Sequence, residues 1–347
     1  MLRLPRTIEW VDGRVRLINQ LKLPHELEYV ETSDWRRVAE AIRRMEIRGA
    51  PAIGVAAAFA MALAAVHSRA GSLEEALREL EECARILKST RPTAVNLPWA
   101  VDRVLRAARA AADVEELREM VVRAALEVQR MDEECNRRIG ELGEQLIDDG
   151  DTVMTICNAG SLATSYYGTA TAPIYLAHER GKRVRVIALE TRPYLQGARL
   201  TAWELKQAGI EVKVVTDNAM GIVMEREGVN LVIVGADRVT RRGYVANKVG
   251  TYPLALVARE HGVPFYVAAP TSSFDLSIEG PGEIPIEVRP SEEVVYIYGR
   301  RIAPEGVEAI YYAFDVTPPK LITGIITERG ILYPPYEKSI RRLLSAA

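Results

Sequence analysis

A single thiol stands where an apolar run of the sequence gives way to small polar residues. The run "TVMTIC" ends at Cys157, and "NAGS" follows directly. Consecutive backbone N–H groups at the start of a helix lower the pKa of a thiol and bind anions, so this position could hold a reactive thiolate. A lone cysteine at the end of a strand is more often a small buried apolar residue. Cys157 is therefore a candidate for chemistry that needs support from its surroundings.

Acidic residues follow three further apolar runs. Asp237 ends "LVIVGAD", Asp217 ends "VVTD" and Glu190 ends "VIALE". A carboxylate at such a position can act as a general acid or base, or it can cap the following turn. The residue types alone do not rank the three.

Glycine and arginine occur together in the first third of the chain. "IRGAPAIG" places Arg48 and Gly49 before Ala50 and Pro51, and "STRPTAVNLPWA" contains Arg91. Small residues let a phosphate approach the backbone, a helix N-terminus favours its charge, and an arginine binds it through two hydrogen bonds. The alternative is a glycine turn with a surface arginine.

Two later segments repeat this polar pattern. "ETRPYLQGARL" supplies Arg192, Gln196 and Arg199, and "YVANKVGTYPLA" supplies Asn247 and Lys248, which we expect at the start of a helix. Each segment alone is weak evidence. Their repetition favours a phosphorylated substrate held by polar groups from two domains.

The elements that position these residues follow from the alternation of apolar runs and helical stretches after Asp151. We expect strands within 152–157, 183–190, 211–217, 230–237 and 264–269, with helices between them. This pattern predicts a doubly wound, Rossmann-like parallel sheet, in which ligands bind at the carboxyl ends of the strands. The glycine-rich signatures of NAD and ATP sites do not occur.

The chain before this region is mainly helical. A hairpin is expected around Asp12–Gly13, and helices are expected within 34–45, 73–89, 100–113 and 113–147. We therefore predict an α/β protein with a mainly helical domain with a short β region at 1–130 and a Rossmann-like catalytic domain at 131–347.

Composition excludes several classes of function. The 45 Lys and Arg nearly balance the 47 Asp and Glu, and no basic stripe suggests nucleic-acid binding. The three cysteines and four histidines have no paired spacing, so we expect no metal site and a reducing, cytoplasmic compartment. The uncharged run 49–68 is alanine-rich and opens with Gly and Pro, which favours a buried helix over a membrane span.

The motifs together resemble those of the methylthioribose-1-phosphate isomerase family of methionine salvage. The resemblance is carried in order by "IRGAPAIG", "RPTAVNLPWA", "CNAGSLAT", "ETRPYLQGARLTAWEL", "GADRV", "VANKVGTYPLA" and "AFDVTPPKLITGIITERG". It implies a small N-terminal domain, a Rossmann-like C-terminal domain and a homodimer. It also implies conversion of 5-methylthioribose 1-phosphate to 5-methylthioribulose 1-phosphate, with no cofactor.

The family's functional residues fall on positions already noted. The resemblance implies Cys157 as the reactive cysteine and Asp237 as the catalytic aspartate. It implies substrate and phosphate binding by the following residues: Arg48, Gly49, Ala50, Arg91, Gln196, Asn247 and Lys248. Two departures occur, with Ile156 where the family usually has His and Tyr311-Tyr312 where it usually has Asn-Pro. Neither position is expected to be catalytic, but both leave open a different 5-substituent, such as that of a 5-deoxy sugar phosphate.

Two other readings stay open. Regulatory subunits of the translation-initiation exchange factor share the superfamily and bind partners without catalysis, but such a module does not need Cys157, Asp237, Arg48 and Arg91 together. A ribose-1,5-bisphosphate isomerase of nucleotide salvage is the other reading, and "RGAPAIG" and "ETRPYLQGARL" are more similar to the methylthioribose type.

Overall fold

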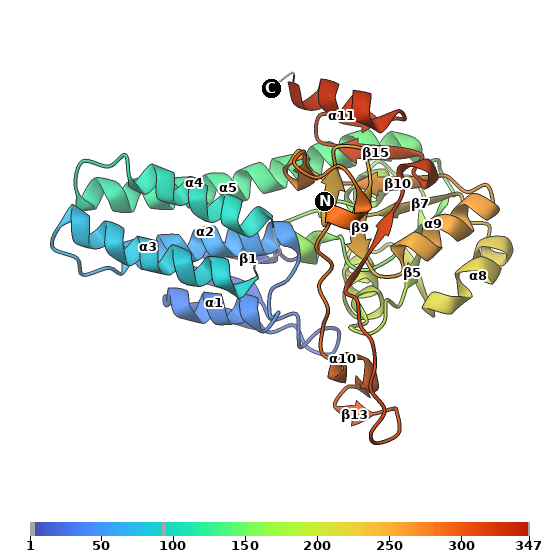
Figure 1. The fold of residues 1–347 in the computed structure, drawn as a ribbon, viewed down its shortest axis with the longest axis horizontal. Helices are drawn as coiled ribbons and strands as arrows, with labels where there is room; N and C mark the ends of the chain where they lie inside the picture. The colour runs from blue at the N-terminus through green and yellow to red at the C-terminus, as the bar shows by residue number, and fades with distance from the viewer. Residues whose placement is uncertain (1–3, 92–94, 346–347) are drawn as a thin grey trace. The chain divides into compact units, whose positions relative to one another are not determined.

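The computed structural model describes residues 4–91 and 95–345, so Pro92, Thr93 and Ala94 of the "RPTAVNLPWA" motif lie outside the described residues. The described residues form two compact units (Figure 1). The N-terminal unit comprises 4–137 and 160–168, and the C-terminal unit comprises 138–159 and 169–345. The sequence suggested one boundary at residue 130. The short segment 160–168, which follows the Cys157 loop, instead belongs with the N-terminal unit.

The N-terminal unit begins with a hairpin that the sequence predicted. Strands β1 (Ile8–Val11) and β2 (Arg14–Ile18) pair antiparallel across Asp12 and Gly13. Both turn residues have positive φ, of 48° and 75°, as the tight turn of a hairpin requires. A third strand, β3 (Tyr29–Thr32), pairs with β2 and was not predicted.

Helix α2 (Ala50–Val66) lies at the centre of the helical part of this unit. It packs against its neighbours, and its residues from Ala52 to Ala65 are all buried, which confirms the prediction of a buried helix. Small side chains allow close approach, and Gly54 packs against the backbone of Asn96. The remaining helices are α1 (Trp35–Arg43), α3 (Leu73–Thr90), α4 (Asn96–Ala108) and α5 (Val114–Gly143), of which the last six residues belong to the C-terminal unit. Among the residues that the structure describes, no helix is both long and apolar enough to span a membrane.

The C-terminal unit is built on a seven-stranded sheet of the described residues, in the order β16-β15-β10-β7-β4-β5-β6. All neighbours are parallel except β15 and β16, which confirms the expected Rossmann-like sheet. Read from β6 to β15, the parallel strands follow the doubly wound order, which reverses direction between β4 and β7. The strands are β4 (Thr152–Thr155), β5 (Arg185–Leu189), β6 (Glu211–Val215), β7 (Leu231–Val234), β10 (Phe265–Ala268), β15 (Gly324–Thr327) and β16 (Gly330–Leu332).

Helices cover this sheet and close its core. Side chains of α8, α9 and α11 share one buried apolar cluster with β4, β7, β10 and β15. The helices are α6 (Ala172–Glu179), α7 (Ala202–Gln207), α8 (Met220–Glu227), α9 (Thr251–Glu260) and α11 (Tyr336–Ser345), with a π-helical turn η3 (Gly197–Thr201) before α7. Single 3-10 turns of this unit are η1 (Glu144–Leu146), η4 (Asp217–Ala219), η5 (Thr271–Ser273), η6 (Pro281–Glu283) and η7 (Pro319–Leu321), and η2 (Ser161–Ala163) lies in the N-terminal unit.

A second, smaller sheet in the same unit has the order β11-β8-β9-β14. Its strands are β8 (Arg238–Thr240), β9 (Val245–Lys248), β11 (Phe274–Asp275) and β14 (Phe314–Thr317). Between β11 and β14 the chain forms an arm, residues 287–313, that extends away from the sheets of this unit (Figure 1). The arm contains α10 (Glu292–Val295), β12 (Tyr296–Ile297) and β13 (Arg300–Arg301).

Candidate active site

The two residues at the centre of the site follow neighbouring strands at the point where the strand order reverses. Cys157 comes after β4 and Asp237 after β7, and these strands pair in parallel. Their loops touch: a Cβ at Gly235 would lie 2.5 Å from the Cβ of Ala159. The crevice beside a reversal of this kind is where doubly wound sheets bind ligands.

The backbone of Cys157 is held on both sides by threonine hydroxyls. Its N–H donates a hydrogen bond of 2.8 Å to Thr191 Oγ1, and its carbonyl accepts one of 2.6 Å from Thr201 Oγ1. We call these two residues the threonine clamp. Cys157 has a φ of 65°, and its side chain is buried. A non-glycine residue in this left-handed conformation is unfavourable by about 1–2 kcal/mol, and the two hydrogen bonds offset that cost.

The expected helix start at Cys157 is wrong. The residues after it form only the 3-10 turn η2, and the next α-helix begins at Ala172. The N–H of Cys157 is already bound to Thr191. The environment of the thiol is therefore set by the threonine clamp and by neighbouring side chains rather than by a helix N-terminus.

The structure gives different surroundings to the three acidic residues that the sequence left unranked. The carboxylate of Asp217 accepts hydrogen bonds from the N–H groups of Thr191 at 2.8 Å and Arg192 at 2.7 Å. It fixes the turn that carries Thr191, so Asp217 acts on the site through the backbone. Burial raises the pKa of Glu190, and the charge of Asp217 adds to the rise.

Asp237 lies at the base of a hairpin with two other predicted site residues. Its N–H donates to the carbonyl of Ala246 at 2.9 Å, and Asn247 and Lys248 follow on β9. The expectation that Asn247 and Lys248 stand at a helix start is wrong, because β9 continues to Lys248 and α9 begins only at Thr251. The amide of Asn247 donates to Thr251 Oγ1 at 3.0 Å. The hairpin thus brings the backbone of Asp237 beside the end of β9, which carries Asn247 and Lys248.

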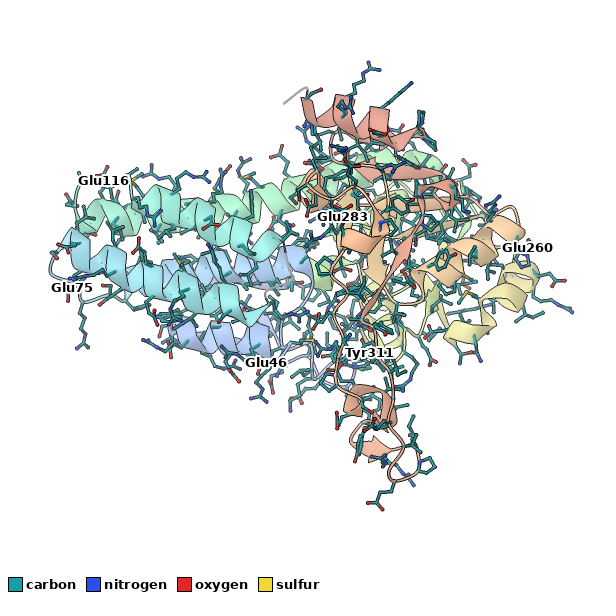
Figure 2. The ribbon with its side chains drawn as sticks, viewed as in Figure 1. Glu46, Glu75, Glu116, Glu260, Glu283 and Tyr311 are labelled. Atoms are coloured by element: carbon teal, nitrogen blue, oxygen red, sulfur yellow. The ribbon has the colours of Figure 1, made fainter. Side chains whose placement is uncertain are left out.

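Tyr311, labelled in Figure 2, is a site residue that the sequence analysis set aside. It is 4% exposed, and Lys248 Nζ donates a hydrogen bond of 3.4 Å to its hydroxyl. Burial raises the pKa of Tyr311, and the neighbouring Glu293 and Cys157 contribute to the rise. Its phenol therefore stays protonated beside the ammonium of Lys248. The only sequence signal was the departure from the family's usual Asn-Pro.

Asp315 is a second residue that the sequence analysis missed. Its carboxylate accepts from the N–H groups of Gly250 at 2.7 Å and Tyr252 at 3.0 Å, and so fixes the chain between β9 and α9. Burial raises its pKa to about 6, although these hydrogen bonds and Lys248 oppose the rise. Asp315 lies opposite Asn247 in the pairing of β14 with β9. A pairing between such distant segments leaves no local signal in the sequence.

Gln196 lies in the turn that follows β5. It is 6% exposed, and among the described residues its Oε1 has no hydrogen-bond partner. The arginines on either side of it are engaged with carbonyls: Arg192 donates to Val294 at 2.6 Å and Arg199 to Tyr194 at 3.3 Å. The buried hydroxyl of Tyr194, in the same turn, also has no partner among the described residues, so either oxygen could accept a hydrogen bond from a substrate hydroxyl.

The remaining predicted residues belong to the N-terminal unit. Gly49 caps α2 with a φ of 95°, Ala50 begins the helix, and Pro51 lies in its first turn, as the sequence predicted. A Cβ at Gly49 would lie 2.5 Å from the backbone of Ala163, so this position requires glycine. Arg48 directly precedes this N-terminus, and Arg91 directly follows α3 (Leu73–Thr90) in a separate loop.

Within residues 4–91 and 95–345, no group of three His, Cys, Asp or Glu side chains is arranged to hold a metal ion. The candidate groups in the C-terminal unit are thus a thiol, a carboxylate, amides, an ammonium and a phenol.

Comparison with known proteins agrees with the motifs. The model of the initiation factor 2 subunit family matches residues 46–334. The chain is 50% identical, over 99% of its length and 96% of the relative, to a protein of Geobacillus thermodenitrificans named methylthioribose-1-phosphate isomerase. It is 52% identical, over 97% of both chains, to a protein of Moorella thermoacetica named 5-deoxyribose 1-phosphate isomerase.

Solved structures give the same result for the fold. The 5-methylthioribose 1-phosphate isomerase of Pyrococcus horikoshii superposes with a TM-score of 0.95 at 44% identity, covering 100% of this chain and 97% of that one. A protein of A. fulgidus described as the delta subunit of translation initiation factor eIF-2B gives 0.91 at 46% identity, covering 98% and 99%. The chain therefore belongs to the initiation factor 2 subunit family and, within it, to the family of the methylthioribose-1-phosphate isomerases.

Proposed function

We propose that this protein is an aldose–ketose isomerase that converts 5-methylthioribose 1-phosphate to 5-methylthioribulose 1-phosphate in methionine salvage. One observation carries the proposal. The chain is about half identical to proteins of that name along nearly its whole length, with a cysteine and an aspartate, Cys157 and Asp237, on neighbouring strands at the reversal of the sheet. A thiol and a carboxylate are two groups that can carry protons during such a reaction.

The chemistry explains why two such groups are needed. The phosphate on the anomeric oxygen prevents the ring from opening as it does in a free aldose. The bond between C1 and the ring oxygen must break, the ring oxygen must gain a proton, and one hydrogen must move from C2 to C1. The C2 hydroxyl loses its proton and becomes a carbonyl. Substrate and product contain the same atoms, so no oxidant or reductant enters.

In this proposal Asp237 transfers the protons that oxygen atoms gain and lose, and Cys157 transfers the proton that moves from C2 to C1. Asp237 gives its proton to the ring oxygen as the ring opens and takes the proton of the C2 hydroxyl as the carbonyl forms. Cys157, as a thiolate, removes the proton from C2 and returns it to C1. Both groups end in the state in which they began. The thiol is only 8% exposed, which supports a site that keeps water from the reacting carbons.

The polar residues that the family resemblance implied bind the substrate in this proposal. The backbone at the start of α2 and the charged side chains bind the phosphate, while the amides bind sugar hydroxyls. Gln196 Oε1 is buried without a partner among the described residues, which supports the role of this amide in binding a sugar hydroxyl. The binding set is Arg48, Gly49, Ala50, Arg91, Gln196, Asn247 and Lys248. We propose further that the protein acts as a cytoplasmic homodimer without a cofactor.

A second candidate substrate is 5-deoxyribose 1-phosphate. A specific observation favours it, because the relative from Moorella thermoacetica that carries this activity in its name is 52% identical to this chain. The two substrates differ only in whether C5 bears a methylthio group or a hydrogen. The same groups would carry out the same isomerisation on either sugar.

Turnover of the purified protein tests these assignments. We expect NMR to show ketose formation from 5-methylthioribose 1-phosphate or 5-deoxyribose 1-phosphate, and much slower conversion of ribose 1,5-bisphosphate. Reaction in D2O should place little deuterium at C1, because the buried Cys157 returns to C1 the proton that it removed from C2. Preference for the bisphosphate would move the protein to nucleotide salvage. No turnover of any of the three by a folded protein would favour the partner-binding subunits of the same family.

A further inference from the structure

Tyr311 makes contacts that none of the roles above uses. We propose that Tyr311 is a positioning residue that fixes the ammonium of Lys248 in place for the phosphorylated substrate. The inference rests on the proposed function for its substrate, since Lys248 belongs to the binding set proposed there. Nothing in the sequence motifs assigns a role to this tyrosine.

The geometry at Lys248 is that of an aromatic cage. Lys248 Nζ lies 4.9 Å from the ring centroid of Phe314 and 5.8 Å from that of Tyr311, and it donates to the Tyr311 hydroxyl at 3.4 Å. Phe314 stands directly opposite Lys248 in the pairing of β9 with β14. Both distances are within the range in which an aromatic ring attracts a cation. Phe314 of β14 and Tyr311, just before that strand, therefore hold an ammonium group that β9 carries.

A lysine at a binding site needs such a partner because its side chain is long and flexible. Holding it in one rotamer has an entropic cost, which contacts formed before the substrate arrives offset. A neutral phenol and an aromatic ring attract the ammonium without cancelling its charge. Lys248 is only 8% exposed, so an anion that reached its ammonium group would meet it in a site with little water.

The backbone of Tyr311 is fixed at the base of the arm. The Tyr311 carbonyl accepts from the N–H of Arg289 at 2.9 Å, and Ala313 N–H donates to the carbonyl of Glu287 at 2.9 Å. These bonds form an antiparallel stem in which neighbouring side chains alternate in direction. Tyr311 is 4% exposed and Tyr312 is 54% exposed. The adjacent tyrosine is thus a matched control that shares the stem but not the burial.

The test compares three variants in steady-state kinetics. Tyr311→Phe removes only the hydroxyl, and we expect KM to rise by about 2- to 10-fold with kcat within about 2-fold of wild type. Tyr311→Leu also removes the ring, and we expect KM to rise by at least about 10-fold. Tyr312→Phe should match the wild type. Should the leucine variant fail to fold, the phenylalanine variant, which keeps the ring, still decides the question.

A second readout separates this inference from the proposed function. We would measure the affinity of each variant for inorganic phosphate by calorimetry, and we expect it to weaken in the order wild type, Tyr311→Phe, Tyr311→Leu. An active wild type with unchanged KM and phosphate affinity in Tyr311→Leu would overturn the role of Tyr311 alone. An inactive wild type with the expected loss of phosphate affinity would overturn the isomerase but keep the positioning role. A wild type that neither turns over nor binds phosphate would overturn both.

Discussion

The hydroxyl of Thr201 donates a hydrogen bond of 2.6 Å to the carbonyl of Cys157. On the other side of the same residue, Thr191 Oγ1 accepts from the Cys157 N–H. The threonine clamp therefore fixes the backbone at the buried thiol in its left-handed conformation. The orientation of the thiol therefore depends on two side chains, Thr191 and Thr201, that the sequence analysis did not select.

Removing either hydroxyl of the clamp should lower turnover without removing the thiol. Thr191→Val and Thr201→Val keep the shape of the side chain but leave a buried backbone group of Cys157 without its partner, a loss of about 1–3 kcal/mol for each. We expect kcat to fall by at least about 10-fold in each valine variant, because a small displacement of a reacting group is costly. Steady-state kinetics would measure this, with Thr191→Ser and Thr201→Ser as controls that keep the hydroxyl.

Alkylation shows whether the effect acts on the thiol itself. Iodoacetamide modification of Cys157, followed by peptide mass spectrometry, should change in rate in both valine variants and stay near wild type in both serine variants. Cys83, which is buried in the N-terminal unit, serves as an internal reference. Equal alkylation and turnover in the valine and serine variants would show that the clamp does not position Cys157.

The three acidic residues after the strands should differ in their effect on turnover. Asp237→Asn is expected to lower kcat by about 10²- to 10⁴-fold, the range for loss of a general acid or base. Asp217→Asn should have a smaller effect of about 10-fold, because Asp217 acts by holding the N–H groups of Thr191 and Arg192. Glu190→Gln should stay within about 3-fold of wild type. Steady-state kinetics would measure all three, and a Glu190→Gln variant as impaired as Asp237→Asn would reverse the assignment.

A methyl group at Gly49 should destabilise the protein more than one at another glycine of similar conformation. Gly49 and Gly150 have φ values of 95° and 94°, but only Gly49 has a neighbour at the Cβ position, the backbone of Ala163 at 2.5 Å. Gly150→Ala should cost about 1–2 kcal/mol from backbone strain. Gly49→Ala adds overpacking of about 1–3 kcal/mol, which urea titrations would detect. Equal losses would mean that the segment at Ala163 can move aside.

The fold was predictable because its main signals are local. Apolar runs at regular spacing identified strands such as β4 and β7, and Asp12–Gly13 identified the first hairpin. The doubly wound order then follows from general rules for parallel sheets, and it places the ends of β4 and β7 beside each other. Cys157, Asp237, Glu190 and Asp217 could be named as candidates for that reason, but only the family resemblance ranked Cys157 and Asp237 above the other two.

The details of the site were not predictable because they depend on contacts between distant segments. The hydroxyls that bind Cys157 come from 34 and 44 positions away. Tyr311 reaches Lys248 only because β14 pairs with β9, a separation of 63 positions. The segment "NKVG" was expected at the start of a helix, while the pairing that extends β9 to Lys248 has no local signature.

Stability should depend on pH through Asp132, which holds the segment after the Cys157 loop. Its carboxylate accepts from the N–H of Ser165 at 2.7 Å, from the Ser165 hydroxyl, and from the amide of Asn136 at 3.0 Å. Burial raises the pKa of Asp132 from 3.8 to about 6, although these bonds oppose the rise. The folded state therefore keeps a proton at this carboxyl at pH values where the unfolded chain has lost it.

The sign of the effect follows from that difference. Below about pH 4 both states are protonated, and the contribution is fully present; it is lost as pH rises to about 6, and it stays constant above that. A rise from 3.8 to about 6 corresponds to about 3 kcal/mol at most.

Asp132→Asn does not ionise, so its free energy of unfolding should fall less than that of the wild type between about pH 4 and about pH 7. Urea titrations across this range would measure the difference. Glu74→Gln, at a side chain 84% exposed, is the control, and parallel curves for wild type and Asp132→Asn would refute the coupling.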